Sequence, residues 1–313
     1  MKSYAILCLS FCLSLVSPLA RADSPFTTDA KPERGTLEIS YKGRKLLVYA
    51  YATNQFKPYV RELYTLRGEN VLRDAPPDHL HHHGLMYACY VNGINFWEER
   101  VSPGIERHMG LAIATMEEMG EKHLPAASFT EQVHWLAPTN TSDPLLVEQR
   151  KVMLVVDEKT GEVALRWSSE FSVGPGVAKV VIRGPNYNGL GMRLPESFNH
   201  VAKFQNAANE PYVSKNSQNV IGARWTSVVG QMEGRDVMLA MFGRPENARG
   251  DGFFFTMLDP FAYLAATQGM DKQPLEYGAG DHFNLNYLLT VYGEQKSPEF
   301  IAQRYDQWTK ESK

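Results

Sequence analysis

Short runs of β-branched and aromatic residues, separated by turn residues, make up most of the chain. LEISY and RKLLVYA flank Lys42-Gly43, and LMYACYV and INFW flank Asn92-Gly93. KVMLVV and EVALRWSSEF flank a third turn at Lys159–Gly161. Each pair has the pattern of a β-hairpin, and Asn-Gly is the strongest of the short hairpin turns. The pattern predicts an antiparallel, mostly β protein.

A helical pattern is clearest near the end of the chain. Ser297 is a helix N-cap residue, and Pro298 occupies the first helical position. Apolar side chains then recur at helical spacing at Phe300, Ile301, Tyr305 and Trp308. The stretch from Ile105 to Glu118 fits either a helix or a strand.

No repeat and no Pro- or Ser-rich linker divides the chain. Two Gly/Pro/Asn-rich loops are predicted at residues 137–144 and 185–195, and strand patterns continue on both sides of each loop. The sequence therefore predicts the all-β class. We expect one large antiparallel β-sandwich domain, residues 23–313, with a C-terminal helix and with loops that carry the functional site.

The first 22 residues have the pattern of a secretory signal peptide. A basic Lys2 precedes the apolar run YAILCLSFCLSLV, and Ala20-Arg21-Ala22 is a small-x-small cleavage site. Cleavage after Ala22 would give an exported protein, periplasmic or secreted. Residues 23–313 contain a single cysteine, Cys89, so we expect the fold to be stable without an internal disulfide.

The charge pattern narrows the class of partner. The formal net charge is −3, the pI is about 6.3, and no basic stripe could follow a phosphate backbone, which argues against nucleic acid. No later apolar run reaches the roughly 18–20 residues of a membrane span. We expect a small-molecule or oligosaccharide partner; the oligomeric state stays open.

The most unusual feature is a cluster of four histidines, out of nine in the chain, at His79, His81, His82 and His83. If the segment is extended, His79, His81 and His83 share one face and His82 lies on the other. Three imidazoles on one face need partners when they are buried. Metal binding, acid–base catalysis, recognition of sugar hydroxyls and a polar loop bonded to its own backbone all remain open.

The metal hypothesis rests on His-x-His, a common arrangement for holding a transition metal on a strand. It would place a divalent transition metal on His79, His81 and His83, but no second motif at ligand spacing supplies a further ligand. Acid–base catalysis requires no cofactor, because a histidine with a pKa near ~6.5 moves protons at neutral pH.

The residues from Arg73 to Met86 and from Val91 to Trp97 resemble the hallmark of the PmoA-like family of bacterial proteins, also labelled methane oxygenase. The usual family pattern is Asp-His-Pro-His-His-Arg-Gly, followed by Asn-Gly-x-Asp-Phe-Trp. This chain has Leu80, His83 and Asn95 where Pro, Arg and Asp are usual. The loss of that arginine affects any role that needs a fixed positive charge. Methane oxidation is not expected, because the chain after residue 22 has no apolar run that spans a membrane.

A more remote resemblance is to galactose-mutarotase-like proteins, which are large β-sandwiches. The shared order is a histidine-rich stretch ending at Gly84, Asn199-His200, Glu276 and then Gly280–Phe283 before the final strand. The resemblance implies that His81 or His82, together with His200, binds or protonates a sugar oxygen. It implies that Glu276 is the carboxylate base.

Other residues near these motifs are candidates for binding a substrate. Trp97 offers an aromatic ring for a sugar face, Arg73, Arg193 and Arg61 offer guanidinium groups for a carboxylate, and one of Glu98 and Glu99 is expected to face the site and the other water. The full substrate-binding set is His79, His83, Arg73, Asp78, Asn92, Trp97 and Arg193.

Together these features predict an exported carbohydrate-active protein that uses His/carboxylate acid–base chemistry, as an isomerase, lyase or hydrolase. The alternatives are a metal-dependent enzyme of the oxygenase label and a sugar-binding module without catalysis.

Overall fold

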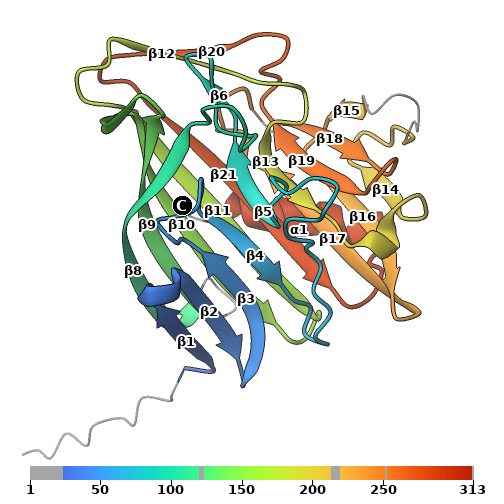
Figure 1. Cartoon of the computed structure of the whole chain (residues 1–313). Coiled ribbons are helices and arrows are strands. Elements are labelled where there is room, and N and C mark those ends of the chain that lie inside the picture. Colours follow the sequence, from blue (N-terminus) through green and yellow to red (C-terminus); the bar gives the residue numbers. More distant parts are fainter. Residues whose placement is uncertain (1–23, 120–122, 213–218, 251, 312–313) are drawn as a thin grey trace, which may run out of the picture.

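Two large antiparallel sheets lie face to face, and a small sheet lies across one end of them, at the top of Figure 1. The computed structural model describes residues 24–119, 123–212, 219–250 and 252–311. The signal peptide predicted at residues 1–22 lies outside this described part. The all-β class, the antiparallel sandwich and the C-terminal helix are confirmed.

Every pairing between neighbouring strands in the described residues is antiparallel, as the hairpin patterns predicted. In the described part of the chain, the nine-stranded sheet runs in the order β1 (Phe26–Lys31), β2 (Thr36–Tyr41), β3 (Arg44–Ala50), β4 (Tyr59–Leu63), β5 (Leu85–Ala88), β13 (Gly189–Arg193), β19 (Tyr263–Thr267), β18 (Phe253–Met257), β15 (Asn219–Gly222). Within the same residues, the eight-stranded sheet runs β14 (Lys203–Asn206), β16 (Trp225–Met232), β17 (Arg235–Gly243), β21 (His282–Tyr292), β11 (Glu162–Val173), β10 (Asn140–Asp157), β9 (Leu124–Ala137), β8 (Ile105–Met119). The small sheet has four described strands, β20 (Leu275–Gly278), β12 (Lys179–Arg183), β6 (Tyr90–Val91), β7 (Ile94–Asn95). Two short 3₁₀ helices are η1 (Pro32–Arg34) and η2 (Glu196–Phe198).

Alternation along the strands separates the core between the sheets from a second apolar face. On β5, Leu85 and Tyr87 point into the core between the two large sheets. Met86 and Ala88 point to the opposite face of the nine-stranded sheet, where they join a separate cluster with Trp97. This outer face is not covered by the other large sheet, so it is available to carry a site.

The C-terminal helix α1 (Pro298–Lys310) covers the outer face of the eight-stranded sheet. The Ser297 hydroxyl caps it by accepting a hydrogen bond from the Phe300 amide at 3.3 Å. Ile301, Tyr305 and Trp308 are buried against that sheet. The predicted capping and the predicted apolar stripe are both confirmed.

Turn chemistry and strand pairing explain where sequence patterns were reliable. Asn92 and Gly93 have φ angles of 51° and 80°, the left-handed pair that a tight hairpin requires. The stretch from Ile105 that fitted either structure is strand β8, because it pairs with β9 along nearly its whole length. Most of the loop predicted at residues 137–144 is likewise the start of β10.

Among the described residues, no helix is both long and apolar enough to cross a bilayer.

A buried polar network joins the two large sheets. The Arg150 guanidinium, fully buried on β10, donates to both carboxylate oxygens of Glu148 at 2.8 Å. It also donates to the Tyr49 hydroxyl at 3.1 Å and to the Pro58 carbonyl at 2.9 Å, both in the part of the chain that forms the opposite sheet. Burial raises the pKa of the neighbouring Glu106 carboxyl well above its usual range, even though Glu106 accepts a hydrogen bond from the same guanidinium at 3.3 Å.

Replacing Arg150 by methionine should lower the free energy of unfolding by about 3–5 kcal/mol, because the Glu148 carboxylate would lose its buried counter-charge. Urea denaturation followed by tryptophan fluorescence measures the change. Lys151→Met is the matched control, since Lys151 is the next residue on β10 and is exposed. Equal stability of the two variants would show that the network contributes nothing.

Candidate functional site

The histidine segment is not extended; it folds as two consecutive turns. The His79 amide donates to the Pro76 carbonyl, and the His82 amide donates to the His79 carbonyl, both at 2.9 Å. These i to i+3 bonds break the strict alternation of an extended segment. The expectation that His79, His81 and His83 share one face is therefore wrong, because His82 joins His79 and His81 and His83 is turned away.

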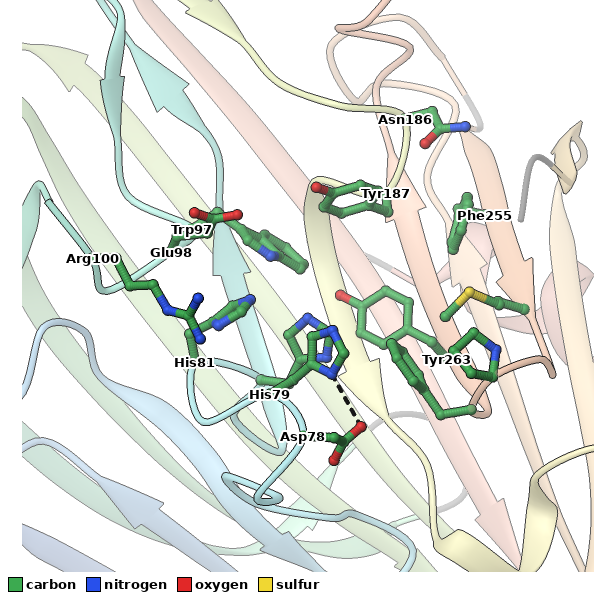
Figure 2. A pocket seen from close by; sticks show the side chains of 14 residues that line it. Asp78, His79, His81, Trp97, Glu98, Arg100, Asn186, Tyr187, Phe255 and Tyr263 are labelled. Carbon is green, nitrogen blue, oxygen red and sulfur yellow. Dashed lines mark hydrogen bonds and ion pairs between the residues drawn. The ribbon is translucent and has the colours of Figure 1, made fainter. Parts of the chain in front are cut away.

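His79, His81 and His82 line a pocket of about 610 Å³ on the outer face of the nine-stranded sheet (Figure 2). Its wall combines the histidine turns, the segment after β7, the loop before β13, and strands β18 and β19. The residues that line it are Asp78, His79, His81, His82, Trp97, Glu98, Arg100, Asn186, Tyr187, Phe255, Met257, Pro260, Phe261 and Tyr263.

Two local structural features position the aromatic and acidic side chains of this pocket. The Asn95 side-chain oxygen accepts hydrogen bonds from the Trp97 and Glu98 amides at 2.8 and 3.0 Å, so the chain turns directly after β7. On β13, a Cβ at Gly191 would lie 1.8 Å from the Tyr263 hydroxyl. Only glycine at this position lets Tyr263 pack beside Trp97.

Arg193 links three residues that line the pocket through hydrogen bonds. Its guanidinium, buried on β13, donates to His82 Nδ1 at 3.2 Å and to Asp78 Oδ2 at 2.6 Å. The same Asp78 oxygen lies 3.0 Å from His79 Nδ1. Because Arg193 always donates, His82 Nδ1 must be unprotonated, so neutral His82 carries its proton on Nε2. His79 donates from Nδ1 to Asp78, which leaves its Nε2 as the second nitrogen available for a ligand.

Charge in the pocket follows from burial and from this network. Burial, aided by the neighbouring histidines and Arg193, lowers the pKa of His82 to about 2. Burial also lowers the pKa of His81, against the opposing charge of the Glu98 carboxylate. Burial favours protonation of Asp78, but hydrogen bonds from Arg193 and His79 hold its pKa well below the usual range. At neutral pH, His81 and His82 are therefore neutral and Asp78 is an anion.

His83 lies in a separate buried ion network. Its Nδ1 is 3.0 Å from Asp74, its Nε2 is 2.9 Å from Glu99, and its ring stacks on Tyr59. Glu99 also accepts from the buried Lys57 ammonium at 2.7 Å. Burial disfavours the charged imidazole, but the hydrogen bonds to both carboxylates outweigh it and raise the pKa of His83. Both ring nitrogens of His83 are thus held by carboxylates, and His83 does not line the pocket.

The metal set His79, His81 and His83 is not assembled, because both ring nitrogens of His83 are occupied by carboxylates. Across the part of the chain that the structure describes, no group of three or more His, Cys, Asp or Glu side chains is arranged to hold a metal ion.

His200 and Glu276, predicted as catalytic, lie outside the pocket. His200 is exposed in the loop after η2, where its Nδ1 is 3.5 Å from Asp259. Glu276 is half-exposed on β20 of the small sheet and pairs with Lys179 at 2.6 Å. Their order along the chain matched the remote resemblance, but the loop that carries His200 and the strand that carries Glu276 do not bring them to the histidines.

Arg73 and Asn92, predicted to bind a substrate, also have structural partners elsewhere. Arg73 pairs with Glu196 at 3.1 Å. The Asn92 side chain donates to the Lys179 carbonyl and accepts from the Val181 amide, so it fixes the hairpin to β12. Arg193 contacts the pocket residues but does not line the pocket.

Several pocket residues were missed or left undecided by the sequence. Glu98 faces the pocket, as one of the two glutamates was expected to, but Glu99 joins the buried network and not water. Arg100 had no recognisable motif, and Tyr187 was not predicted as a site residue. Phe255 and Tyr263 come from strands far away in the sequence, so no local pattern indicated them.

Protonation of His82 should destabilise the fold in acid. A histidine in an unfolded chain has a pKa of ~6.5, whereas His82 in the fold has a pKa of about 2. Between these values the unfolded chain binds the extra proton, so the free energy of unfolding falls as pH drops below 6.5, by about 1.4 kcal/mol per pH unit. Urea denaturation between pH 6.5 and 4.5 should show a shallower fall for His82→Gln. If the free energy of unfolding fell equally steeply with pH in the unaltered protein and in His82→Gln, a neutral His82 would be contradicted.

Comparison with solved structures finds likeness over most of the chain at low identity. A GH36 α-galactosidase, AgaB, from Geobacillus stearothermophilus has a TM-score of 0.51 at 9% identity, and the match covers 86% of this chain and 41% of that chain. An α-galactosidase from Lactobacillus brevis has a TM-score of 0.47 at 7% identity, with 85% and 39% covered. A glycoside hydrolase family 97 enzyme variant from Pseudoalteromonas sp. strain K8 has 0.43 at 9%, with 86% and 34% covered.

This chain thus spans between about a third and two fifths of the length of these proteins, and the likeness at such identity concerns the fold alone. A comparison with curated proteins found no match. Residues 36–306 match the model of a family of unknown function, DUF6807, and the chain belongs to that family.

Proposed function

We propose that this protein binds a carbohydrate in the histidine pocket and acts on it by acid–base chemistry. The observation that carries the proposal is one pocket that combines an Asp78–His79 pair, two neutral histidines, a carboxylate at Glu98 and an aromatic wall. A volume of about 610 Å³ falls within the roughly 300–1,000 Å³ that is typical of small-molecule sites.

The aromatic wall suits the apolar face of a sugar ring. Trp97 and Tyr187 meet edge to face, with ring centroids 5.4 Å apart, and Phe255 packs against Tyr187 at 6.0 Å. In Figure 2, Tyr187 and Phe255 lie away from His79 and His81, whereas Trp97 lies beside His81. Trp97 also meets His82 edge to face, with ring centroids 6.1 Å apart. A sugar bound here would present C–H groups to Tyr187 and Trp97 and hydroxyl groups to the imidazoles.

The hydrogen-bond network assigns separate roles to the polar side chains. Asp78 accepts from His79 Nδ1 and orients the ring, so His79 Nε2 is the base that takes a proton from the substrate. His82 offers its Nε2 proton to a hydroxyl or ring oxygen, because Arg193 occupies Nδ1. The Glu98 carboxylate accepts no hydrogen bond from the described residues and is the partner that gives or receives the second proton.

The shared sandwich fold supports a carbohydrate partner in a limited way. The solved structure with a TM-score of 0.51 is described as an α-galactosidase, but it is more than twice as long as the matched region. Any catalysis by this chain therefore has to rest on its own pocket residues.

His79→Gln and Glu98→Gln should each lower kcat at least ~100-fold on the sugar that the protein turns over, while the Kd for that sugar changes only a few-fold. Turnover is followed by NMR across a panel of neutral and acidic sugars, and binding by calorimetry. Glu276→Gln is the control, because Glu276 pairs with Lys179 away from the pocket. Full activity in both pocket variants would overturn the acid–base assignment. Binding without turnover by the unaltered protein would indicate a sugar-binding module.

A further inference from the structure

A second hollow lies next to the pocket. It has a volume of about 230 Å³ and is lined by Tyr90, Arg183, Gly184, Pro185, Met270 and Asp271. Its wall is continuous with that of the pocket, because residues 183–185 line the hollow and the next two residues, Asn186 and Tyr187, line the pocket. One five-residue segment, which begins at the last residue of β12, therefore borders both.

The small sheet fixes this neighbourhood from the other side. On β6, Tyr90 pairs with Arg183 of β12 and with Asn95 of β7. Asn95 is the residue whose side chain turns Trp97 and Glu98 into the pocket. The hollow and the pocket thus share both a loop and a sheet, and their relative position is set by hydrogen-bonded strands.

Each of the two recesses is lined by one arginine that has no carboxylate within ion-pair distance among the described residues, although Arg183 adds to the effect of Lys179 in lowering the pKa of the Glu276 carboxyl. Arg100 lines the pocket and Arg183 lines the hollow, and neither forms an ion pair with any side chain in the described residues. By contrast, the arginines first considered for a carboxylate ligand are already paired. These pairs are Arg61 with Glu62, Arg73 with Glu196, and Arg193 with Asp78.

An unpaired arginine in a recess is suited to a carboxylate. Its planar guanidinium donates two parallel hydrogen bonds to a carboxylate group, and it remains charged at every pH at which the protein is folded. His81 and His82 add no positive charge, and Arg100 is the one lysine or arginine among the residues that line the pocket. In the hollow, Asp271 can accept hydrogen bonds from sugar hydroxyls beside Arg183.

We propose that the pocket and the hollow are consecutive subsites for an acidic oligosaccharide, at least two sugar residues long, with carboxylates bound by Arg100 and Arg183. This rests on the proposed function, because it places the reacting sugar in the histidine pocket. It adds that the substrate is a chain of uronic acid residues and that its next residue lies in the hollow, past Tyr90 and Tyr187.

Calorimetric titration of the full protein tests the charge and the length of the ligand separately. The probes are galacturonate, α-1,4-digalacturonate and the neutral α-1,4-galactobiose, followed by the corresponding series of the gluco and manno configurations. In at least one series, the acidic disaccharide should bind about tenfold more tightly than the acidic monosaccharide and about tenfold more tightly than the neutral disaccharide.

Two variants then assign these differences to residues. Arg183→Gln should abolish the advantage of the acidic disaccharide over the acidic monosaccharide. Arg100→Gln should weaken both acidic ligands about tenfold and leave the neutral disaccharide unchanged. Arg224→Gln is the matched control, because it also removes one arginine charge. Arg224 pairs with Asp306 of α1, the helix that covers the eight-stranded sheet, and lines neither recess.

The outcomes separate this proposal from the proposed function. If neutral sugars bind as tightly as acidic ones, or mono- and disaccharides bind equally in every series, the acidic two-subsite proposal is wrong, while sugar binding by the histidine pocket stands. If no sugar in any series binds, both proposals are wrong. If binding is acidic and length-dependent but insensitive to both arginine variants, the site lies elsewhere and the proposal is wrong.

Discussion

The candidate site depends on one buried cation, the Arg193 guanidinium. A charge of this kind is stable in a protein interior only when hydrogen-bonded partners compensate for the lost water. Arg193 has Asp78 and His82 as such partners, and its guanidinium carbon lies 3.4 Å from the centre of the Phe261 ring. Because Arg193 projects from a central strand of the nine-stranded sheet, it holds the histidine turns against that sheet.

The same cation also determines which protons the pocket contains. It keeps Asp78 ionised, and Asp78 in turn accepts the Nδ1 proton of His79. It occupies Nδ1 of His82 and so leaves a proton on the opposite nitrogen. Fold and chemistry are therefore coupled at one residue. A substitution of Arg193 would change both the position of the histidine turns and the protonation of the pocket side chains.

Local patterns in the sequence predicted much of the architecture. Asn92-Gly93 needs only its own backbone preference to form a hairpin, and the helix after Ser297 needs only its cap and its apolar stripe. The stretch from Ile105 carried no decisive local signal, and its strand conformation comes from pairing with β9. The histidine segment was predicted wrongly, because turns and a distant arginine overrode the alternation assumed for it.

The candidate site was only partly predictable for a similar reason. The histidines and Trp97 stood out by residue type within a short segment, and the structure does bring most of them together. His200 and Glu276 were chosen by their order along the chain, and order does not determine which strands lie side by side. The aromatic residues of β18 and β19 become neighbours of the histidines only because β19 pairs with β13 and β18 pairs with β19.

The ionisation of His83 affects the pH range in which the fold is stable. An arginine between Asp74 and Glu99 would keep its charge at any biological pH, whereas an imidazolium loses it in alkali. The raised pKa of His83 means that this ion network contributes its full stability below the ordinary histidine pKa and loses it as pH rises through the raised value. Deprotonation of His83 therefore sets an alkaline limit on the stability that this network gives the fold.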